Sequence, residues 1–167
     1  MKKALILLAI GSIAISVAFG QLGGFPIPDS SFYANAQEIQ AMHNALDTQQ
    51  LQAYKSIRLL DLVYPLFYGL FFILAIYALA KRVCIRQWTY RALPFFPAIA
   101  MMADYKENIL LMLALRVMPE INWAASLAGF CTSAKWVSLL ASLLICFALL
   151  IRQIHLFVRA KCIRCGP

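Results

Sequence analysis

Long apolar runs separated by short polar segments dominate the hydrophobic pattern of this chain. The runs cover about residues 4–20, 59–80, 93–117 and 134–156. A membrane-spanning helix needs roughly 20 mainly apolar residues, with a range of about 17–25. The pattern therefore predicts four spanning helices in a single membrane domain, 1–167, with an outer segment at 21–58 and a tail at 157–167.

The polar segment between the first two runs has helical periodicity of its own. It opens with GGFPIPDSS, which is typical of a turn followed by a helix cap. Ile39, Met42 and Leu46 then recur at helical spacing, which predicts a short amphipathic helix. Thr48 can cap a further helix that continues into the second span without a break. Pro65 is expected to kink that long helix.

The first run permits two interpretations. MKK followed by ALILLAIGSIAISVAFG is similar to a signal peptide, with Ala18 and Gly20 at suitable positions for cleavage. Alternatively, Ser12, Ser16 and Gly20 repeat every four residues and place small side chains on one helix face, as in a retained and closely packed span. We favour the retained span, and the topology of the other spans is the same in both cases.

Composition and charge agree with a membrane protein. The chain is 63% hydrophobic and 13% charged, whereas soluble domains average about 45–50% apolar and about 25% charged residues. The net charge of +8 lies mainly beside the apolar runs, at Lys2, Lys3, Lys81, Arg82, Arg86, Arg91, Arg152, Arg159, Lys161 and Arg164. No acidic residue accompanies them, so the positive-inside rule predicts two cytoplasmic termini in an inner (plasma) membrane and gives no reason to expect nucleic acid.

The third apolar run is interrupted by polar residues in the stretch ADYKENILL. Asp104, Glu107, Asn108 and Leu111 share one helix face, because they follow the spacing i, i+3, i+4 and i+7. At 1.5 Å per residue from Pro94, Asp104 should lie about 15 Å into the membrane, near its midplane. A charge there costs about 2.5–3.5 kcal/mol on insertion scales, so this face should point into the bundle.

Charged residues near the outer ends of other spans can complete a polar network with this face. Arg58 and Asp61 open the second span, and Lys135 opens the fourth. The predicted network consists of Arg58, Asp61, Asp104, Glu107, Asn108 and Lys135. Either it is structural and fixes how the helices pack, or it is an outward-facing site for a proton, an ion or a lipid headgroup.

The remaining polar and thiol side chains suggest little chemistry. His43 has no acidic or histidine partner at ligand spacing and is expected to be a solvated surface residue. Cys162 and Cys165 form a Cys-x-x-Cys pair without the second knuckle of a zinc ribbon, so the sequence predicts no metal and no cofactor. No nucleophile–base pair or phosphate loop is visible, so enzymatic activity stays open with its absence favoured.

Several of these motifs together resemble a known group. They are Asp61, Pro65 and Tyr68, then Leu93-Pro94, the Asp104-x-x-Glu107-Asn108 motif, Pro119, and Lys135-Trp136. The chain is similar in these positions to small, uncharacterised four-helix integral membrane proteins of bacteria with an Asp-x-x-Glu-Asn motif in the third span. The resemblance covers about half of the chain and implies the four-helix architecture, but no activity.

The sequence thus predicts an all-α integral membrane four-helix bundle with a helical extracytoplasmic segment between the first two spans. Two functional hypotheses follow. In the first, a multi-pass membrane protein binds or moves a proton, ion or lipid headgroup at its polar network. In the second, it is an accessory or assembly subunit of a larger membrane complex, with the lipid bilayer and other membrane-protein subunits as partners.

Overall fold

All regular structure in the described part of the chain is helical. The computed structural model describes residues 1–22, 24–25, 31–83, 87–117 and 123–164. Its elements are α1 (Lys2–Leu22), α2 (Ala36–Asn44), α3 (Thr48–Leu60), α4 (Tyr64–Arg82), α5 (Gln87–Ala92), α6 (Phe95–Val117) and α7 (Trp123–Arg164).

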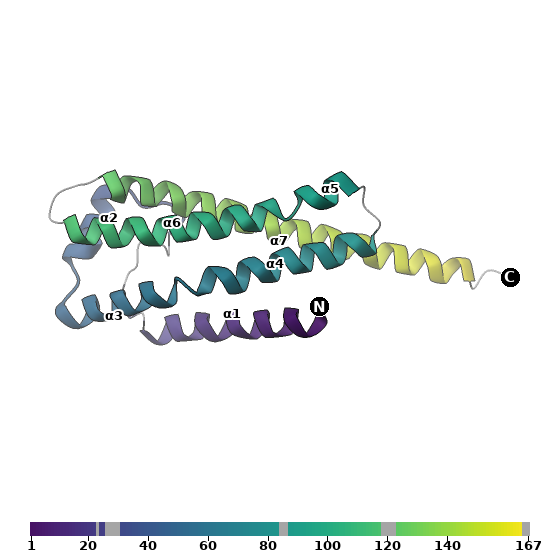
Figure 1. Ribbon diagram of the computed structural model, residues 1–167, viewed down its shortest axis with the longest axis horizontal. Helices are drawn as coiled ribbons and strands as arrows, with labels where there is room; N and C mark the ends of the chain where they lie inside the picture. Colours follow the sequence, from purple (N-terminus) through teal and green to yellow (C-terminus); the bar gives the residue numbers. More distant parts are fainter. Residues whose placement is uncertain (23, 26–30, 84–86, 118–122, 165–167) are drawn as a thin grey trace.

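The four long helices α1, α4, α6 and α7 run alongside one another (Figure 1). α6 and α7 make the most extensive contact, and α4 packs against both of them, while α1 lies against α4. The start of α1, the end of α4 and the end of α7 lie towards one end of the molecule, and α2 and α3 lie towards the other (Figure 1).

Three stretches of the described chain are long and apolar enough to cross a membrane. They are Lys2–Leu22, Thr48–Arg82 and Trp123–Arg159. The helix α6 has 23 residues, which is sufficient length, but Asp104, Lys106 and Glu107 in its middle make it too polar to qualify by composition. The prediction of a helical membrane protein is therefore confirmed at the level of three apolar candidate spans.

Capping boxes begin both helices of the polar segment. Asn35 accepts a hydrogen bond from the backbone N–H of Glu38, and the Glu38 carboxylate accepts one from the N–H of Asn35. Asp47 and Gln50 repeat the arrangement at the start of α3, so the cap is Asp47 and not the predicted Thr48. Each box satisfies two backbone N–H groups that have no partner within the helix. This fixes where α2 and α3 start.

The prediction of one unbroken helix from Thr48 into the second span is wrong. α3 ends at Leu60 and α4 starts at Tyr64, with a turn between them. Pro65 lies in the first turn of α4 and has no N–H to offer the carbonyl four residues earlier, that of Asp61. The side-chain amide of Asn108 donates to this carbonyl at 3.2 Å, so α6 supplies the missing hydrogen bond.

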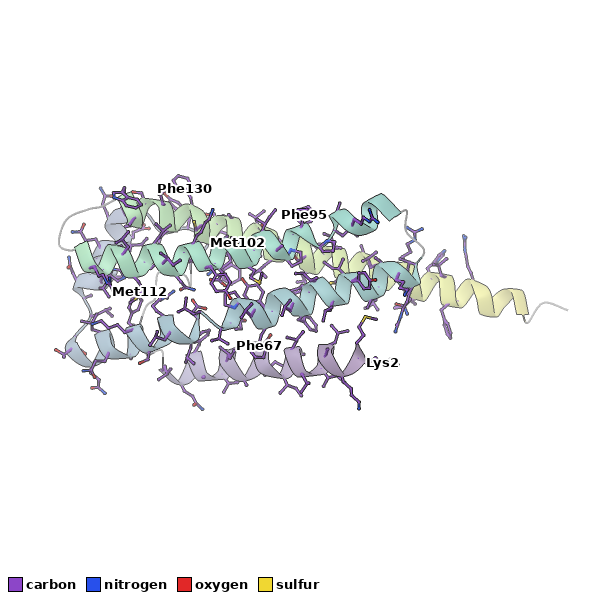
Figure 2. All side chains as sticks on the ribbon, viewed as in Figure 1. Lys2, Phe67, Phe95, Met102, Met112 and Phe130 are labelled. Atoms are coloured by element: carbon purple, nitrogen blue, oxygen red, sulfur yellow. The ribbon has the colours of Figure 1, made fainter. Side chains whose placement is uncertain are left out.

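The helix α1 packs loosely on the rest of the structure. Gly11 makes the close approach, since a Cβ atom there would lie within 2.3 Å of the Phe67 ring atoms of α4 (Phe67 is labelled in Figure 2). Ser16 hydrogen-bonds Tyr64 through their hydroxyl groups at 3.2 Å. Gly20, in contrast, has nothing within 4 Å, and no residue of α1 is buried. The predicted small-residue face is thus in contact only over its first half.

The helix α7 extends beyond the predicted span 134–156 at both ends. Its first turns are rich in alanine and follow closely on the turn 118–122, which lies outside the described residues. Thr132 and Ser133 bond the carbonyls of Ala128 and Gly129 four residues earlier, so the hydroxyls do not interrupt the helix.

Two apolar clusters form the core at opposite ends. One joins α2, α6 and α7 through Ala34, Ile39, Leu111, Ala114, Ala124, Ala125 and Ala128, and the other joins α4 and α7 through Ile76, Ala80, Val83 and Leu149. Between these two clusters along α7 lie Thr132, Lys135, Ser138 and Ser142, which are all buried. The middle of the bundle is therefore polar where its ends are apolar.

Candidate functional site

The structure brings all six residues of the predicted network into the interior. Their exposed fractions are 2% for Arg58, 5% for Asp61, 2% for Asp104, 0% for Glu107, 1% for Asn108 and 6% for Lys135. They come from α3 and its C-terminal cap, from α6 and from α7. Their contacts divide into two groups, joined by the neighbouring residues Glu107 and Asn108.

The lysine group consists of Lys135, Asp104 and Glu107 with two hydroxyl donors. The Lys135 ammonium lies 2.5 Å from Glu107 Oε2 and 3.3 Å from Asp104 Oδ1. The Tyr68 hydroxyl donates to Asp104 Oδ2 at 2.8 Å, and the Thr132 hydroxyl donates to Glu107 Oε1 at 2.6 Å. Each carboxylate therefore accepts from a hydroxyl on one oxygen and from Lys135 on the other, so α4, α6 and α7 meet here.

The arginine group consists of Arg58, Asp61 and Asn108. Arg58 Nη1 donates to Asn108 Oδ1 at 2.7 Å and lies 3.3 Å from Asp61 Oδ2. The other end of the same Asn108 amide donates to the Asp61 backbone carbonyl. One asparagine on α6 thus holds both the cation and the chain break between α3 and α4, a task for which an amide suits because it offers both acceptor and donor.

The two groups are unequal in charge. Among the described residues they contain three carboxylates, on Asp61, Asp104 and Glu107, but two cations, on Arg58 and Lys135. The excess lies in the lysine group, where one ammonium faces two carboxylates. A buried carboxylate without a compensating charge is costly in an apolar surrounding. This arrangement favours a proton or a monovalent cation as the missing positive charge.

Grooves reach the network at its edges. A groove of about 330 Å³ between α3 and α6 is lined by Arg58 and Asn108, with Leu59, Met112 and Arg116 among its other lining residues. Two further grooves reach the Tyr68 side, one along α1 and one along α7. Asp104 and Glu107 line none of these grooves. The sequence hypothesis of an opening that reaches Glu107 from outside therefore finds no support in them.

His43 is buried, contrary to the prediction of a solvated histidine. It is 5% exposed, and its Nε2 lies 3.0 Å from the Tyr54 hydroxyl. Ile39 and His43 lie one turn apart on α2 and turn to the same face, which carries the histidine inward with the isoleucine. Burial, assisted by the Arg58 guanidinium, lowers the pKa of His43 from 6.5 to about 4.

Sequence reasoning missed Tyr68, Thr132 and the His43–Tyr54 pair. Tyr54 and Tyr68 were assigned to an interfacial aromatic belt, because their positions near the end of a span suit one. Thr132 could have been found, since it lies three residues before Lys135 and so shares its helix face. The burial of Tyr54 depends on how α2 folds back, which no local pattern encodes.

The cysteines add no metal site in the described part of the chain. Among those residues no group of histidine, cysteine and acidic side chains could hold a metal ion, and Cys131 and Cys146 are free thiols. Cys84 and Cys165 lie outside the described residues, and so does the side chain of Cys162. The comparison with known proteins found no matching family model, no matching curated protein and no matching solved structure.

We expect the charge of Lys135 to stabilise the bundle more than either acid it contacts. Lys135→Met leaves two buried carboxylates unpaired and should lower the free energy of unfolding by about 3–5 kcal/mol. Glu107→Gln removes the excess charge while keeping an acceptor for Thr132, and should cost about 1 kcal/mol or less. Unfolding in detergent, with the exposed Lys55→Met as control, measures both. Equal losses in the two variants would contradict the charge balance given above.

The buried His43 should make stability depend on pH. The unfolded chain takes up a proton near pH 6.5, whereas the folded protein does so only near pH 4. The unfolded state therefore binds more protons in this window, and stability should fall by up to about 1.4 kcal/mol per unit as the pH drops from 6.5 towards 4. Unfolding midpoints measured across this range test it. His43→Gln should flatten the slope, and His155→Gln, at an exposed site, should leave it unchanged.

Proposed function

We propose that α1, α4, α6 and α7 all cross the inner membrane and that both termini are cytoplasmic. Two observations support this. The helices lie side by side, so α6 shares the depth of its neighbours although it is too polar to qualify alone (Figure 1). Lys2, Lys3, Lys81 and Arg82 lie at one end of the molecule, and Glu38 and Asp47 cap helices at the other.

A fluorescent protein fused to the C-terminus tests this topology. It should fluoresce, because the fold of such a reporter forms in the cytoplasm, and alkaline phosphatase at the same position should be inactive. The same two reporters placed after residue 46, between α2 and α3, should give the opposite pair of results. A fluorescent fusion at residue 46 would overturn the proposed orientation.

We infer that the protein holds a proton, or a small monovalent cation, between Asp104 and Glu107 in the middle of the membrane. The charge balance carries this proposal: one ammonium faces two carboxylates, and all three are buried. Two carboxylates that share a site disfavour a second negative charge, so one of them retains a proton. The proton belongs to the pair and not to either residue alone.

The surrounding groups suit exchange of that proton. The Tyr68 hydroxyl bonds Asp104 and also lies 3.3 Å from the Ala100 carbonyl, so its donor can turn between two acceptors. The grooves beside Tyr68 bring space for small molecules to within one hydroxyl of Asp104. On the opposite side, the groove at Arg58 and Asn108 approaches Glu107 through its neighbour in sequence. Exchange would need only small movements at these two edges.

A structural role as an accessory subunit is the second candidate, and one observation favours it. Asp104 and Glu107 are enclosed, and each has a hydroxyl and an ammonium as partners. A network satisfied in this way can fix the register of α4, α6 and α7 without exchanging anything. The two candidates differ in whether the proton moves, and not in whether it is present.

Infrared difference spectroscopy of the reconstituted protein tests for the proton. At neutral pH the wild-type protein should show the carbonyl band of one protonated, buried carboxylic acid, and the band should shift in D₂O. Glu107→Gln should abolish it, because Asp104 and Lys135 then form a neutral pair. Loss of the wild-type band on adding Na⁺ or K⁺ would identify the cation that replaces the proton. Absence of the band in every medium would overturn the proposal.

Flux measurements then separate the two candidates. Proteoliposomes loaded with a pH-sensitive dye should dissipate a pH gradient faster with the wild-type protein than with Glu107→Gln. Lys55→Met, at an exposed position, serves as the matched control and should behave as wild type. Equal rates for all three proteins, together with a wild-type carboxylic acid band, would leave the accessory role as the supported function.

A further inference from the structure

Lys106 presents a charge on the outside of the bundle at the centre of α6. It lies eleven residues from both Phe95 and Val117, which places it about 16 Å from either end of the helix. The residue is exposed, although its neighbours Asp104 and Glu107 are buried. If α6 crosses the membrane as proposed above, the Lys106 ammonium meets hydrocarbon at the depth where charge is most costly.

Neither of the explanations that the sequence allowed for Lys106 agrees with the structure. A lysine can extend its charge to the headgroups only from near the end of a span, and both ends of α6 are beyond the reach of this side chain. The carboxylates that neighbour it in sequence are bonded to Lys135, Tyr68 and Thr132 on the opposite side of the helix. No described carboxylate forms an ion pair with Lys106. The charge therefore calls for an anion from another molecule.

An apolar groove leads to Lys106 along the seam between α6 and α7. It has a volume of about 600 Å³ and is lined on α6 by residues from Phe95 to Lys106 and on α7 by Leu127, Phe130, Cys131 and Ala134. Phe95, Met102 and Phe130 are labelled in Figure 2, and their exposed fractions are 66%, 54% and 64%. Lys106 is the lining residue of α6 farthest from the start of that helix. The groove thus combines a long apolar wall with one cation at mid-membrane depth.

The depth of the cation decides between possible occupants. A phospholipid keeps its phosphate at the membrane surface, so a lipid chain in this groove would bring only hydrocarbon to Lys106. A second copy of the chain is also unsuitable, because its described carboxylates are enclosed near Arg58 and Lys135 or cap α2 and α3. An acidic side chain near the middle of another membrane helix meets both requirements. Such intramembrane charges are rare and usually pair with each other.

We propose that the groove between α6 and α7 binds a transmembrane helix of a different protein, with an aspartate or glutamate of that helix paired to Lys106. Apolar side chains of the partner helix fill the wall between Phe95 and Phe130, and the ion pair fixes its depth and rotation. This inference rests on the proposed membrane topology but not on the proton site, because Lys106 faces away from the lysine group. It gives the accessory-subunit role a defined surface.

Photocrosslinking in native membranes tests the proposal. A photoreactive phenylalanine analogue replaces Met102 in the groove, and the matched control carries it at Phe147 of α7, which is 60% exposed and outside the groove. Met102 should give one protein adduct whose crosslinked peptide, read by mass spectrometry, is an apolar helix containing an acidic residue. Phe147 should give lipid adducts only.

Substitutions at Lys106 establish whether the charge recruits the partner. Lys106→Glu and Lys106→Leu should each reduce the adduct by about tenfold or more, whereas Lys106→Arg should retain it. Combining Lys106→Glu with a lysine in place of the partner's acidic residue should restore the adduct. Because Lys106→Leu suits a lipid-facing position, it keeps the test valid if the glutamate variant fails to fold.

The other outcomes each overturn a distinct part. An adduct with a second copy of this chain, with lipid alone, or with a helix whose capture ignores Lys106 would refute the acidic partner. Failure of Met102 to react with either lipid or protein, with lipid adducts still formed at Phe147, would mean that α6 faces water and would refute the topology itself.

Discussion

The bundle depends on the contact of one ammonium with two carboxylates. Lys135 reaches Asp104 and Glu107, which lie one turn apart on α6, and the hydroxyls of Tyr68 and Thr132 complete their coordination. Without Lys135 the acidic face of α6 could not be buried at this depth, since an isolated carboxylate would have to neutralise or leave the interior. The extensive packing of α6 on α7, and of α4 on both, follows from this pairing.

The apolar contacts are arranged around that constraint. Alanine-rich turns of α7 pack on α2 and α6 at one end, and Leu149 packs on Ile76 and Ala80 of α4 at the other. Small side chains at these positions let the helices approach closely, which brings the Lys135 ammonium within reach of α6. Polar specificity in the middle and dispersion contacts at the ends thus act together, and neither would define the register of the helices alone.

The predictions from sequence succeeded where a pattern reports a local or facial property. The spacing of Asp104, Glu107 and Asn108 placed them on one face, and the structure buries that face together with Arg58, Asp61 and Lys135. They failed where a third element decides. His43 is buried because α2 folds back, and the chain breaks after Leu60 because Asn108 of α6 accepts the carbonyl that Pro65 leaves open. The exposure of Lys106 likewise follows from which way α6 is turned against α7.

The junction of α3 and α4 has a mechanical consequence. Its two rigid segments are joined by a short turn, and a single amide of Asn108 holds both the Asp61 carbonyl and the Arg58 side chain. Any tilt of α3 away from α6 would strain both of these bonds together. Since α2 rests on α3 through His43 and Tyr54, the whole outer cap behaves as one lever with Asn108 as its latch, one residue from the shared charge on Glu107.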